Sequence, residues 1–318
     1  MDAAIAALNA VVGDRLRARG NGLDTPMAIY EGNEPLALRR RAIAAARPAA
    51  TGRVCVLVHG LGHTERVWSF PGARETSYGS LLERDLGYTP YQVRYNSGLH
   101  ISENGESLAG LLEALVAAHP VRVREVVLLG HSMGGLVARS ACHVASRQGH
   151  GWVKRVKRVF YVGSPHLGAP LEKLGNAVAW VLRSIPNPYT ELVSGVLNLR
   201  SSGIKDLRFA NLARQDWEGR DPDALLEDRR TALPLLPGVA HCALVGTLTV
   251  SERHVVTWLL GDSLVRVASA AGRSRDERRS PSLPQADVRV FPGVGHLRLA
   301  HDRAVYAHIR ARCAGEKP

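Results

Sequence analysis

Short apolar runs alternate with longer segments of helical periodicity from residue 53 onward. The runs are rich in Val and Leu and apolar on both faces, which is typical of parallel strands covered by helices. Their alternation with helical segments predicts an α/β fold, with a mostly parallel central sheet and right-handed crossovers. The expected strands are Val54–Val58, Tyr91–Tyr95, Glu125–Leu129, Arg158–Val162, Cys242–Val245 and Val288–Phe291.

The first fifty residues have a different pattern. Apolar residues from Ile5 to Leu16 recur at helical spacing and predict an amphipathic helix over residues 2–18. A second helix is expected over 36–47, and a loop containing Gly, Asn and Pro joins the two. We therefore expect an N-terminal helical extension, followed by the main domain over 51–318.

A segment of some seventy residues interrupts the strand and helix alternation. It contains several Pro and Gly and no convincing core strand, which predicts a functional lid or small subdomain, here called the cap (about 171–240). Helices are expected at Leu171–Ser184 and Ile204–Arg214. The cap holds apolar residues that either contact an acyl chain or form its own core; they are Trp180, Val181, Leu182, Val193 and Val196.

The sharpest chemical motif is G-H-S-M-G-G over residues 130–135. It follows an expected strand directly and precedes an expected helix, Gly135–Arg147, which is the context that a G-x-S-x-G nucleophile elbow requires. Ser132 is then on a tight, strained turn with its hydroxyl exposed, and Gly130 and Gly134 avoid collisions that a Cβ atom would make. The helix N-terminus places N–H groups near developing negative charge.

A second motif, H-G-L-G over 59–62, also follows an expected strand. Acyl transfer by a serine needs two N–H donors aimed at the oxyanion, and losing one typically costs about 3–4 kcal/mol of barrier. The expected donors are the backbone N–H groups of Leu61 and Met133. His59 is expected to shape this loop rather than to transfer protons.

These motifs resemble those of the α/β-hydrolase family, in its lipase and esterase branch. The resemblance covers about residues 53 to 310 and rests on V-L-V-H-G-L-G (56–62), G-H-S-M-G-G and G-S-P-H-L-G-A-P (163–170), together with a late Asp and His pair. The third stretch is similar to a G-T-P-H-x-G-S-P segment of bacterial triacylglycerol lipases and glycosylphosphatidylinositol-deacylase-like proteins. In that branch it opens the cap.

The family's chain order of Ser, then acid, then His places the remaining partners late in the sequence. The match for the base is His296, in a loop after the last expected strand, with His301 and His308 as alternatives on the expected helix Ala300–Arg312.

For the acid, the match implied by the resemblance is Asp262. It lies in a segment similar to G-D-G-x-V-P-x-x-S-A, but Ser263 and Arg266 replace the usual Gly and Pro. Asp276 is the alternative in the main domain. Further aspartates fall within the cap: Asp206, Asp216, Asp221, Asp223 and Asp228.

The expected reaction is two-step hydrolysis of a carboxylic ester through an acyl-enzyme, as in a carboxylesterase or lipase, with no metal and no cofactor. His63, Trp68 and His166 are candidates for the substrate pocket. The same fold and triad also serve acyltransferases, thioesterases and amidases, which remain alternatives. An inactive hydrolase fold acting as a binding module is a further alternative.

Composition adds an expectation about the surface charge of the protein and leaves the interpretation of the motifs unchanged. The 318 residues carry 41 Lys and Arg against 29 Asp and Glu, a net charge of +12, which makes a nucleic-acid or anionic-lipid partner a hypothesis. Aromatic residues are only 5% and the basic stretches avoid the motifs, so no nucleic acid is expected, and transient contact with an anionic lipid surface remains a hypothesis.

The expected location follows from the N-terminus and the length of the apolar runs. The first residues lack a positively charged start, and no apolar run reaches about 18 residues, so we expect a soluble, cytoplasmic protein. The four cysteines are far apart and in no C-x-x-C spacing, so Cys55 and Cys242 are expected to be reduced and buried.

Overall fold

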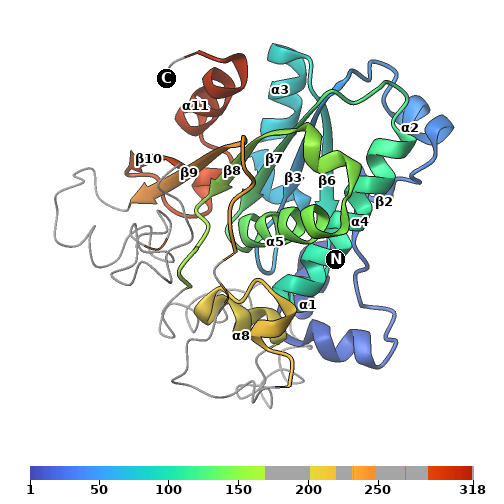
Figure 1. Ribbon diagram of the computed structural model, residues 1–318, viewed down its shortest axis with the longest axis vertical. Helices are drawn as coiled ribbons and strands as arrows, with labels where there is room; N and C mark the ends of the chain where they lie inside the picture. Colours follow the sequence, from blue (N-terminus) through green and yellow to red (C-terminus); the bar gives the residue numbers. More distant parts are fainter. Residues whose placement is uncertain (169–200, 220–230, 232, 248–268, 270–285, 317–318) are drawn as a thin grey trace.

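An eight-stranded sheet forms the centre of the computed structural model, with the strand order β10-β9-β8-β7-β3-β6-β1-β2 (Figure 1). The structure describes residues 1–168, 201–219, 231, 233–247, 269 and 286–316. The strands are β1 (Ala28–Glu31), β2 (Glu34–Pro35), β3 (Arg53–Val58), β6 (Thr89–Arg94), β7 (Glu125–His131), β8 (Val156–Val162), β9 (Ala240–Thr247) and β10 (Ala286–Pro292).

The six strands from β10 to β6 in this order are parallel to one another. Five of them contain a strand expected from the apolar runs, and β6 overlaps the expected strand Tyr91–Tyr95 but ends at Arg94. The predicted α/β fold class is therefore confirmed. Burial on both faces explains why these strands could be recognised, since five of the six residues of β3 are buried. The carboxyl ends of β3, β7 and β8 lie side by side and present the loops that carry the motifs.

Helices cover the two faces of this sheet (Figure 1). One apolar cluster joins Val54, Val56 and Val58 of β3 to α4 and α5, and the other joins Cys55 and Leu57 to α3 and α11. The helices are α1 (Asp2–Ala18), α2 (Arg40–Ala46), α3 (Tyr78–Leu86), α4 (Ile101–Ala118), α5 (Met133–Gln148), α8 (Ser202–Phe209) and α11 (Arg303–Ala314). Shorter elements are the 3-10 helices η1 (Glu65–Trp68), η2 (Gly151–Arg155), η3 (Arg214–Asp216) and η6 (Arg298–Ala300), with a small hairpin of β4 (Ser69–Phe70) and β5 (Ala73–Ser77).

The N-terminal segment differs from the sequence prediction in one respect. α1 spans the predicted residues and α2 is shorter than predicted, but the expectation of a plain loop between them was wrong. This stretch forms β1 and β2, and β1 pairs antiparallel with β6, so the first fifty residues supply one edge of the central sheet. The division into an extension and a domain with an inserted cap stays a prediction.

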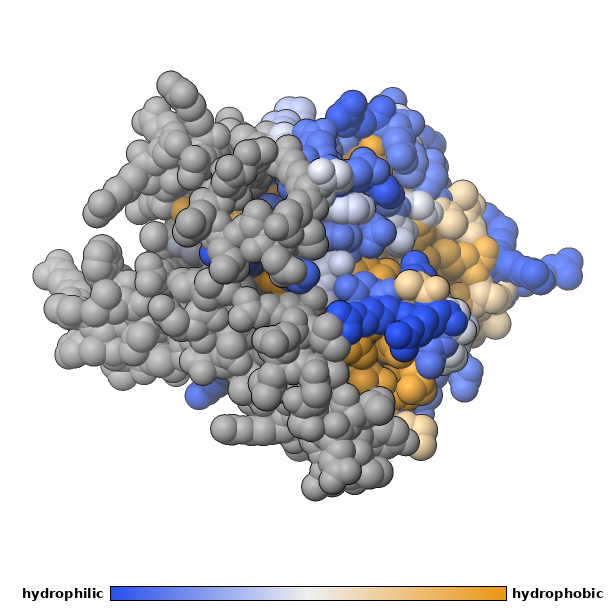
Figure 2. All heavy atoms as spheres, turned by 90° about the horizontal axis from the view of Figure 1, so that it is seen from below, coloured by the Kyte–Doolittle hydropathy of each residue, from blue (hydrophilic) through white to orange (hydrophobic). Residues whose placement is uncertain are grey.

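α8 lies in the predicted cap, and α1 packs against it. The hydroxyl of Ser201 caps α8 and donates a hydrogen bond to the carbonyl oxygen of Ala10 at 2.5 Å, and Ser202 bonds to the carboxylate of Asp14 at 3.1 Å. Figure 2 views this side of the molecule and shows apolar surface next to strongly polar surface. The helix expected at Leu171–Ser184 lies outside the described residues.

The described helices include none that is both long and apolar enough to cross a membrane. All four cysteines are free and buried, as expected for Cys55 and Cys242. Burial raises the pKa of the Cys142 and Cys313 thiols to about 12, so both stay protonated at neutral pH.

Candidate active site

Ser132 has a strained backbone at the junction of β7 and α5. Its φ is 52° and its ψ is −122°, and only one other non-glycine residue in the described part of the chain, Ala210, has a positive φ. Such a conformation persists where surrounding contacts hold it, and it is typical of functional sites. Here the N–H of Ser132 donates a hydrogen bond to the carbonyl oxygen of Val162 at 2.8 Å, which ties the turn to the end of β8.

Glycines allow the chain segments around Ser132 to approach closely. A Cβ atom on Gly134 would lie 2.3 Å from the carbonyl oxygen of Val58, and one on Gly130 would lie 2.4 Å from the Cα of Gly135. A Cβ on Gly60 would lie 2.9 Å from the Cβ of Ser132. The H-G-L-G loop after β3 therefore lies directly against the candidate nucleophile.

The loop after β3 is held by backbone and histidine hydrogen bonds. The N–H of Gly62 donates to the hydroxyl of Ser97 at 3.0 Å, and the N–H of His63 donates to the carbonyl oxygen of Gly60 at 3.3 Å. Leu61 lies in this loop with 9% of its surface exposed, and Met133 is the first residue of α5, directly after Ser132.

His59 shapes this loop from within the core. Its Nδ1–H donates to the carbonyl oxygen of Gly60 at 2.8 Å, and its Nε2 accepts from the N–H of Tyr95 at 3.3 Å. The ring stacks on that of Tyr95, with centroids 4.3 Å apart. Burial lowers the pKa of His59 to about 4, so the imidazole is neutral and both nitrogens are engaged within the loop.

His296 lies in the loop after β10, only 5% exposed, and reaches the ends of β7 and β8. A Cβ on Gly163 would lie 3.1 Å from its Nδ1, and Gly163 follows the residue whose carbonyl accepts from Ser132. The Nε2–H of His131 donates to the carbonyl oxygen of His296 at 3.1 Å, and the two rings lie 5.0 Å apart. The residue before Ser132 thus holds the loop that carries His296.

His63 is a further histidine beside the contact of His131 with His296. The ring of His63 lies 6.1 Å from that of His131, and burial together with neighbouring imidazoles lowers the pKa of His63 to about 3. The same causes lower the pKa of His131 well below its usual value. Both imidazoles are therefore neutral at neutral pH, which limits positive charge beside His296.

His301 and His308, the two alternative candidates for the base, make other contacts. The Nδ1–H of His301 donates to the carbonyl oxygen of Val67 at 3.1 Å, and His308 is buried in α11, with its ring 6.1 Å from that of Phe291.

The candidate acid Asp262 lies outside the described residues, as do Asp276, Asp221, Asp223 and Asp228. The two cap aspartates that the structure describes are bound elsewhere. Asp206 contacts Nδ1 of His100 at 3.0 Å, and Asp216 accepts hydrogen bonds from backbone N–H groups next to η3.

The predicted pocket residues separate into two groups. His63 lines an open pocket described below, whereas Trp68 is fully buried, with its ring 6.1 Å from that of His131. His166 is 2% exposed and packs edge-on against Tyr161 at 4.5 Å, and neither of its ring nitrogens has a hydrogen-bond partner among the described residues.

Sequence reasoning missed the bond from His131 to the His296 loop, because it joins positions 165 residues apart.

Solved structures resemble this chain at low identity, and no curated protein matches it. The mature lipase BlEst2 from Bacillus licheniformis is 17% identical, with a TM-score of 0.46, over 83% of this chain and 93% of the lipase. The esterase Pf2001 from Pyrococcus furiosus is 13% identical, with a TM-score of 0.46, over 84% of this chain and 80% of the esterase. The model of the alpha/beta hydrolase family matches residues 55–308, which is most of the sequence. The chain therefore belongs to the alpha/beta hydrolase family.

Proposed function

We propose that the protein is a serine hydrolase that cleaves carboxylic esters, as a carboxylesterase or lipase does. The observation that carries this proposal is the strained backbone of Ser132, which has Gly60 against one side and the end of β8 on the other. A strained, close-packed serine between a parallel strand and a helix suits a nucleophile, because its hydroxyl is presented at the edge of the sheet. The family match supports the same chemistry at the level of a hydrolase fold.

In the proposed reaction, His296 takes the proton of the Ser132 hydroxyl as the oxygen attacks the ester carbonyl. The N–H groups of Leu61 and Met133 bind the oxyanion, and His296 then protonates the leaving alcohol. Water, activated by His296, hydrolyses the acyl-enzyme and releases the acid. Asp262, outside the described residues, is proposed to accept the Nδ1–H of His296 and to stabilise its protonated form.

Substitution of Ser132 tests the proposal directly. Wild-type protein is expected to hydrolyse p-nitrophenyl esters, and Ser132→Ala is expected to lower kcat by about 10⁴-fold or more while the protein stays folded. A fluorophosphonate probe should label the wild type and not this variant. The matched control is Ser107→Ala on α4, where an exposed hydroxyl donates to the carbonyl oxygen of Glu103, and its kcat should be unchanged.

The same assay distinguishes the alternatives on this fold. Faster turnover of a matched thioester or amide, or acyl transfer to an added alcohol, would replace the ester-hydrolase assignment while keeping Ser132 as nucleophile. Retention of most ester hydrolysis by Ser132→Ala would contradict the proposal itself. A series of esters with increasing acyl length then separates esterase from lipase.

A further inference from the structure

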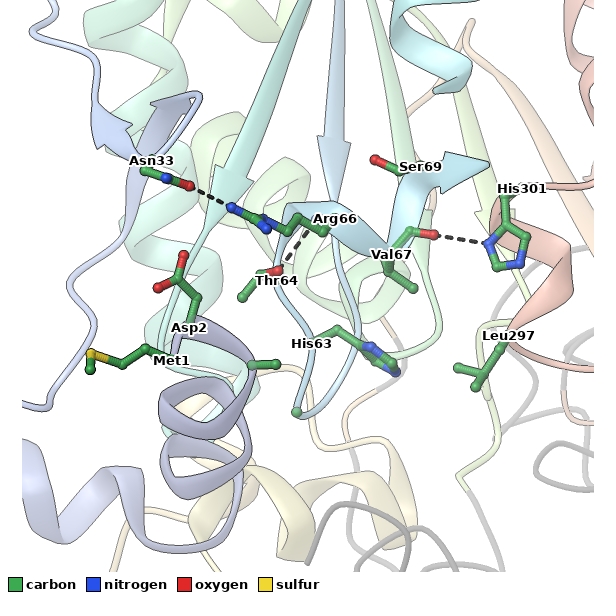
Figure 3. Close-up of a pocket in the computed structure, with 12 residues that line it drawn as sticks. Met1, Asp2, Asn33, His63, Thr64, Arg66, Val67, Ser69, Leu297 and His301 are labelled. Carbon is green, nitrogen blue, oxygen red and sulfur yellow. Dashed lines mark hydrogen bonds between the residues drawn. The ribbon is translucent and has the colours of Figure 1, made fainter. Parts of the chain in front are cut away.

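The H-G-L-G loop after β3 faces open space on one side. Gly62 and His63 line a pocket of about 500 Å³, and the first residues of α1, Met1 and Asp2, line the same pocket (Figure 3). An open pocket restrains a loop less than packed atoms do. The loop carries the N–H of Leu61, the proposed oxyanion donor, so the direction of that N–H depends on contacts made from elsewhere.

Two planar peptide groups flank the Cα of Leu61. The first carries the N–H of Leu61 and the carbonyl oxygen of Gly60, which point in opposite directions because the peptide bond is trans. That oxygen accepts a hydrogen bond from the Nδ1–H of His59 at 2.8 Å. The second peptide group carries the N–H of Gly62, which donates to the hydroxyl of Ser97 at 3.0 Å. The backbone of Leu61 is therefore held on both sides.

The second peptide group depends on the hydrogen bond to Ser97. Gly62 has a φ of 72°, and glycine adopts positive and negative φ values about equally readily. The backbone alone therefore does not keep the peptide group between Leu61 and Gly62 in one orientation. Ser97 is only 1% exposed and supplies a buried acceptor for the observed orientation. Loss of the hydroxyl would leave a buried N–H group unpaired.

The segment that carries Ser97 is held by two helices whose backbones approach it closely. A Cβ on Gly98 would lie 2.0 Å from the carbonyl oxygen of Asn9 in α1, and one on Gly203 in α8 would lie 2.3 Å from that of Ser97. The N–H of Gly203 also donates to the carbonyl oxygen of Gly98 at 3.0 Å. Residues 96–98 therefore lie packed between α1 and α8.

Asn96 makes the hydrogen bond to α1. Its Nδ2 group donates to the carbonyl oxygen of Gly13 at 2.9 Å and to the carboxylate of Asp24 at 2.7 Å. Its Oδ1 accepts from the N–H of Gly98 at 2.9 Å, and a Cβ on Gly13 would lie 1.9 Å from this oxygen. The backbone of α1 departs from helical geometry one residue earlier, at Val12, where φ is −134°. The contact with Asn96 thus falls where α1 is kinked.

We propose that Ser97 is a positioning residue of the proposed ester hydrolysis, which holds the loop that presents the N–H of Leu61 to the oxyanion, and that Asn96 and α1 hold Ser97 in place. The inference rests on the proposed function, because it concerns the oxyanion of that reaction. α1 precedes residue 55, where the family match begins. A part of the chain outside the matched region therefore supports this step.

Removal of the Ser97 hydroxyl tests the inference. Ser97→Ala is expected to lower kcat for a p-nitrophenyl ester by about 10- to 100-fold with KM nearly unchanged, because a misplaced oxyanion donor acts on the transition state. Ser97→Cys, whose sulfur is a weak acceptor, should give an intermediate kcat. The matched control is Ser102→Ala, which removes a buried hydroxyl of α4 that accepts from the indole N–H of Trp217 at 2.9 Å, and its kcat should be unchanged.

A trifluoromethyl ketone separates a positioning role from a loss of folded protein. Its carbonyl carbon bonds to the Ser132 oxygen, and its carbonyl oxygen becomes the oxyanion. The Ki of this inhibitor should rise in Ser97→Ala by about the same factor as kcat/KM falls, whereas a smaller folded fraction would lower kcat and leave Ki unchanged. Asn96→Ala should raise Ki and lower kcat/KM together, by about fivefold or more.

The outcomes distinguish this inference from the proposed function. Wild-type kcat and Ki values in Ser97→Ala, alongside normal ester hydrolysis by the wild type, would overturn the inference and leave the proposed function intact. A wild-type protein that hydrolyses no ester would contradict the proposed function. Hydrogen exchange over residues 59–64 needs no activity: Ser97→Ala should speed it and Ser102→Ala should not, and equal exchange in all three proteins would overturn the role of Ser97 in holding the loop.

Discussion

At the scale of single residues, the candidate site depends on the absence of side chains where backbones meet. Gly134→Ala would place a Cβ atom 2.3 Å from the carbonyl oxygen of Val58 and 2.4 Å from that of His59. Both are backbone atoms, so the turn at Ser132 must shift away from the loop after β3. We expect a loss of about 1–3 kcal/mol in the free energy of unfolding and a fall in kcat. Urea unfolding and ester hydrolysis measure the two effects.

The matched control for this substitution is Gly110→Ala. Gly110 is exposed in α4, and a Cβ there would meet no atom within 4 Å. The change should raise the free energy of unfolding by about 0.5–1 kcal/mol, because Ala loses less conformational entropy in a helix, with no change in kcat. A Gly134→Ala protein as stable and active as this control would show that the turn tolerates the side chain.

The sequence predicted the candidate nucleophile because its signal is local, whereas the candidate base His296 was expected from the chain order of the family that the sequence resembles. The G-x-S-x-G spacing follows directly from the turn, and the strained φ of Ser132 agrees with it. The contact of Gly134 with Val58 joins residues that are distant in the chain, and so does the bond from His131 to the His296 loop. Such contacts depend on how strands align, which no local pattern encodes.

At the scale of elements, Arg94 connects its own strand β6 to three other elements, namely η1, α1 and β1. Its guanidinium makes a bidentate pair with the carboxylate of Glu65 in η1, at 2.7 and 2.6 Å. It also contacts Asp2 of α1 at 3.3 Å and lies 4.0 Å from the ring centroid of Tyr30 in β1. The N-terminal elements are therefore fixed to the sheet next to the loop that forms the candidate site.

Removing the charge of Glu65 tests how much its ion pair with Arg94 contributes to the free energy of unfolding. Glu65 and Arg94 are both buried, so Glu65→Gln should lower the free energy of unfolding by on the order of 3 kcal/mol, since it leaves a buried guanidinium poorly compensated. The control is Glu106→Gln, whose partner is Arg214 in an exposed pair, with an expected loss below about 1 kcal/mol. Equal losses in urea unfolding for the two variants would show that burial adds nothing to the pair.

The strand β1, which Arg94 contacts through Tyr30, could not be predicted from the sequence pattern. The central strands β3 and β7 are nearly continuous apolar runs, because both of their faces are covered. β1 has only four residues, and Ile29 is the one that is fully buried, so its pattern is too short to indicate a strand. Its pairing with β6 is decided by packing of the whole N-terminal segment against the sheet edge.

At the scale of the whole molecule, several histidines are buried as neutral bases, and this makes stability depend on pH. Burial lowers the pKa of His59 to about 4 and, with neighbouring imidazoles, that of His63 to about 3, from an ordinary value of 6.5. Burial also lowers the pKa values of His131, His166 and His241. As pH falls below 6.5, the unfolded chain binds protons that the folded protein does not, so the free energy of unfolding decreases.

The pH dependence should be steep between pH 6.5 and about 4 and absent above pH 7. Between pH 7 and pH 5, His59 alone should lower the free energy of unfolding by about 2 kcal/mol, from its unfolded value of 6.5 and folded value of about 4. His59→Gln cannot take up this proton, so the variant should lose about 2 kcal/mol less than the wild type over the same interval. Urea unfolding at both pH values, followed by tryptophan fluorescence, measures this difference, and identical losses would mean that His59 is not held neutral by the fold.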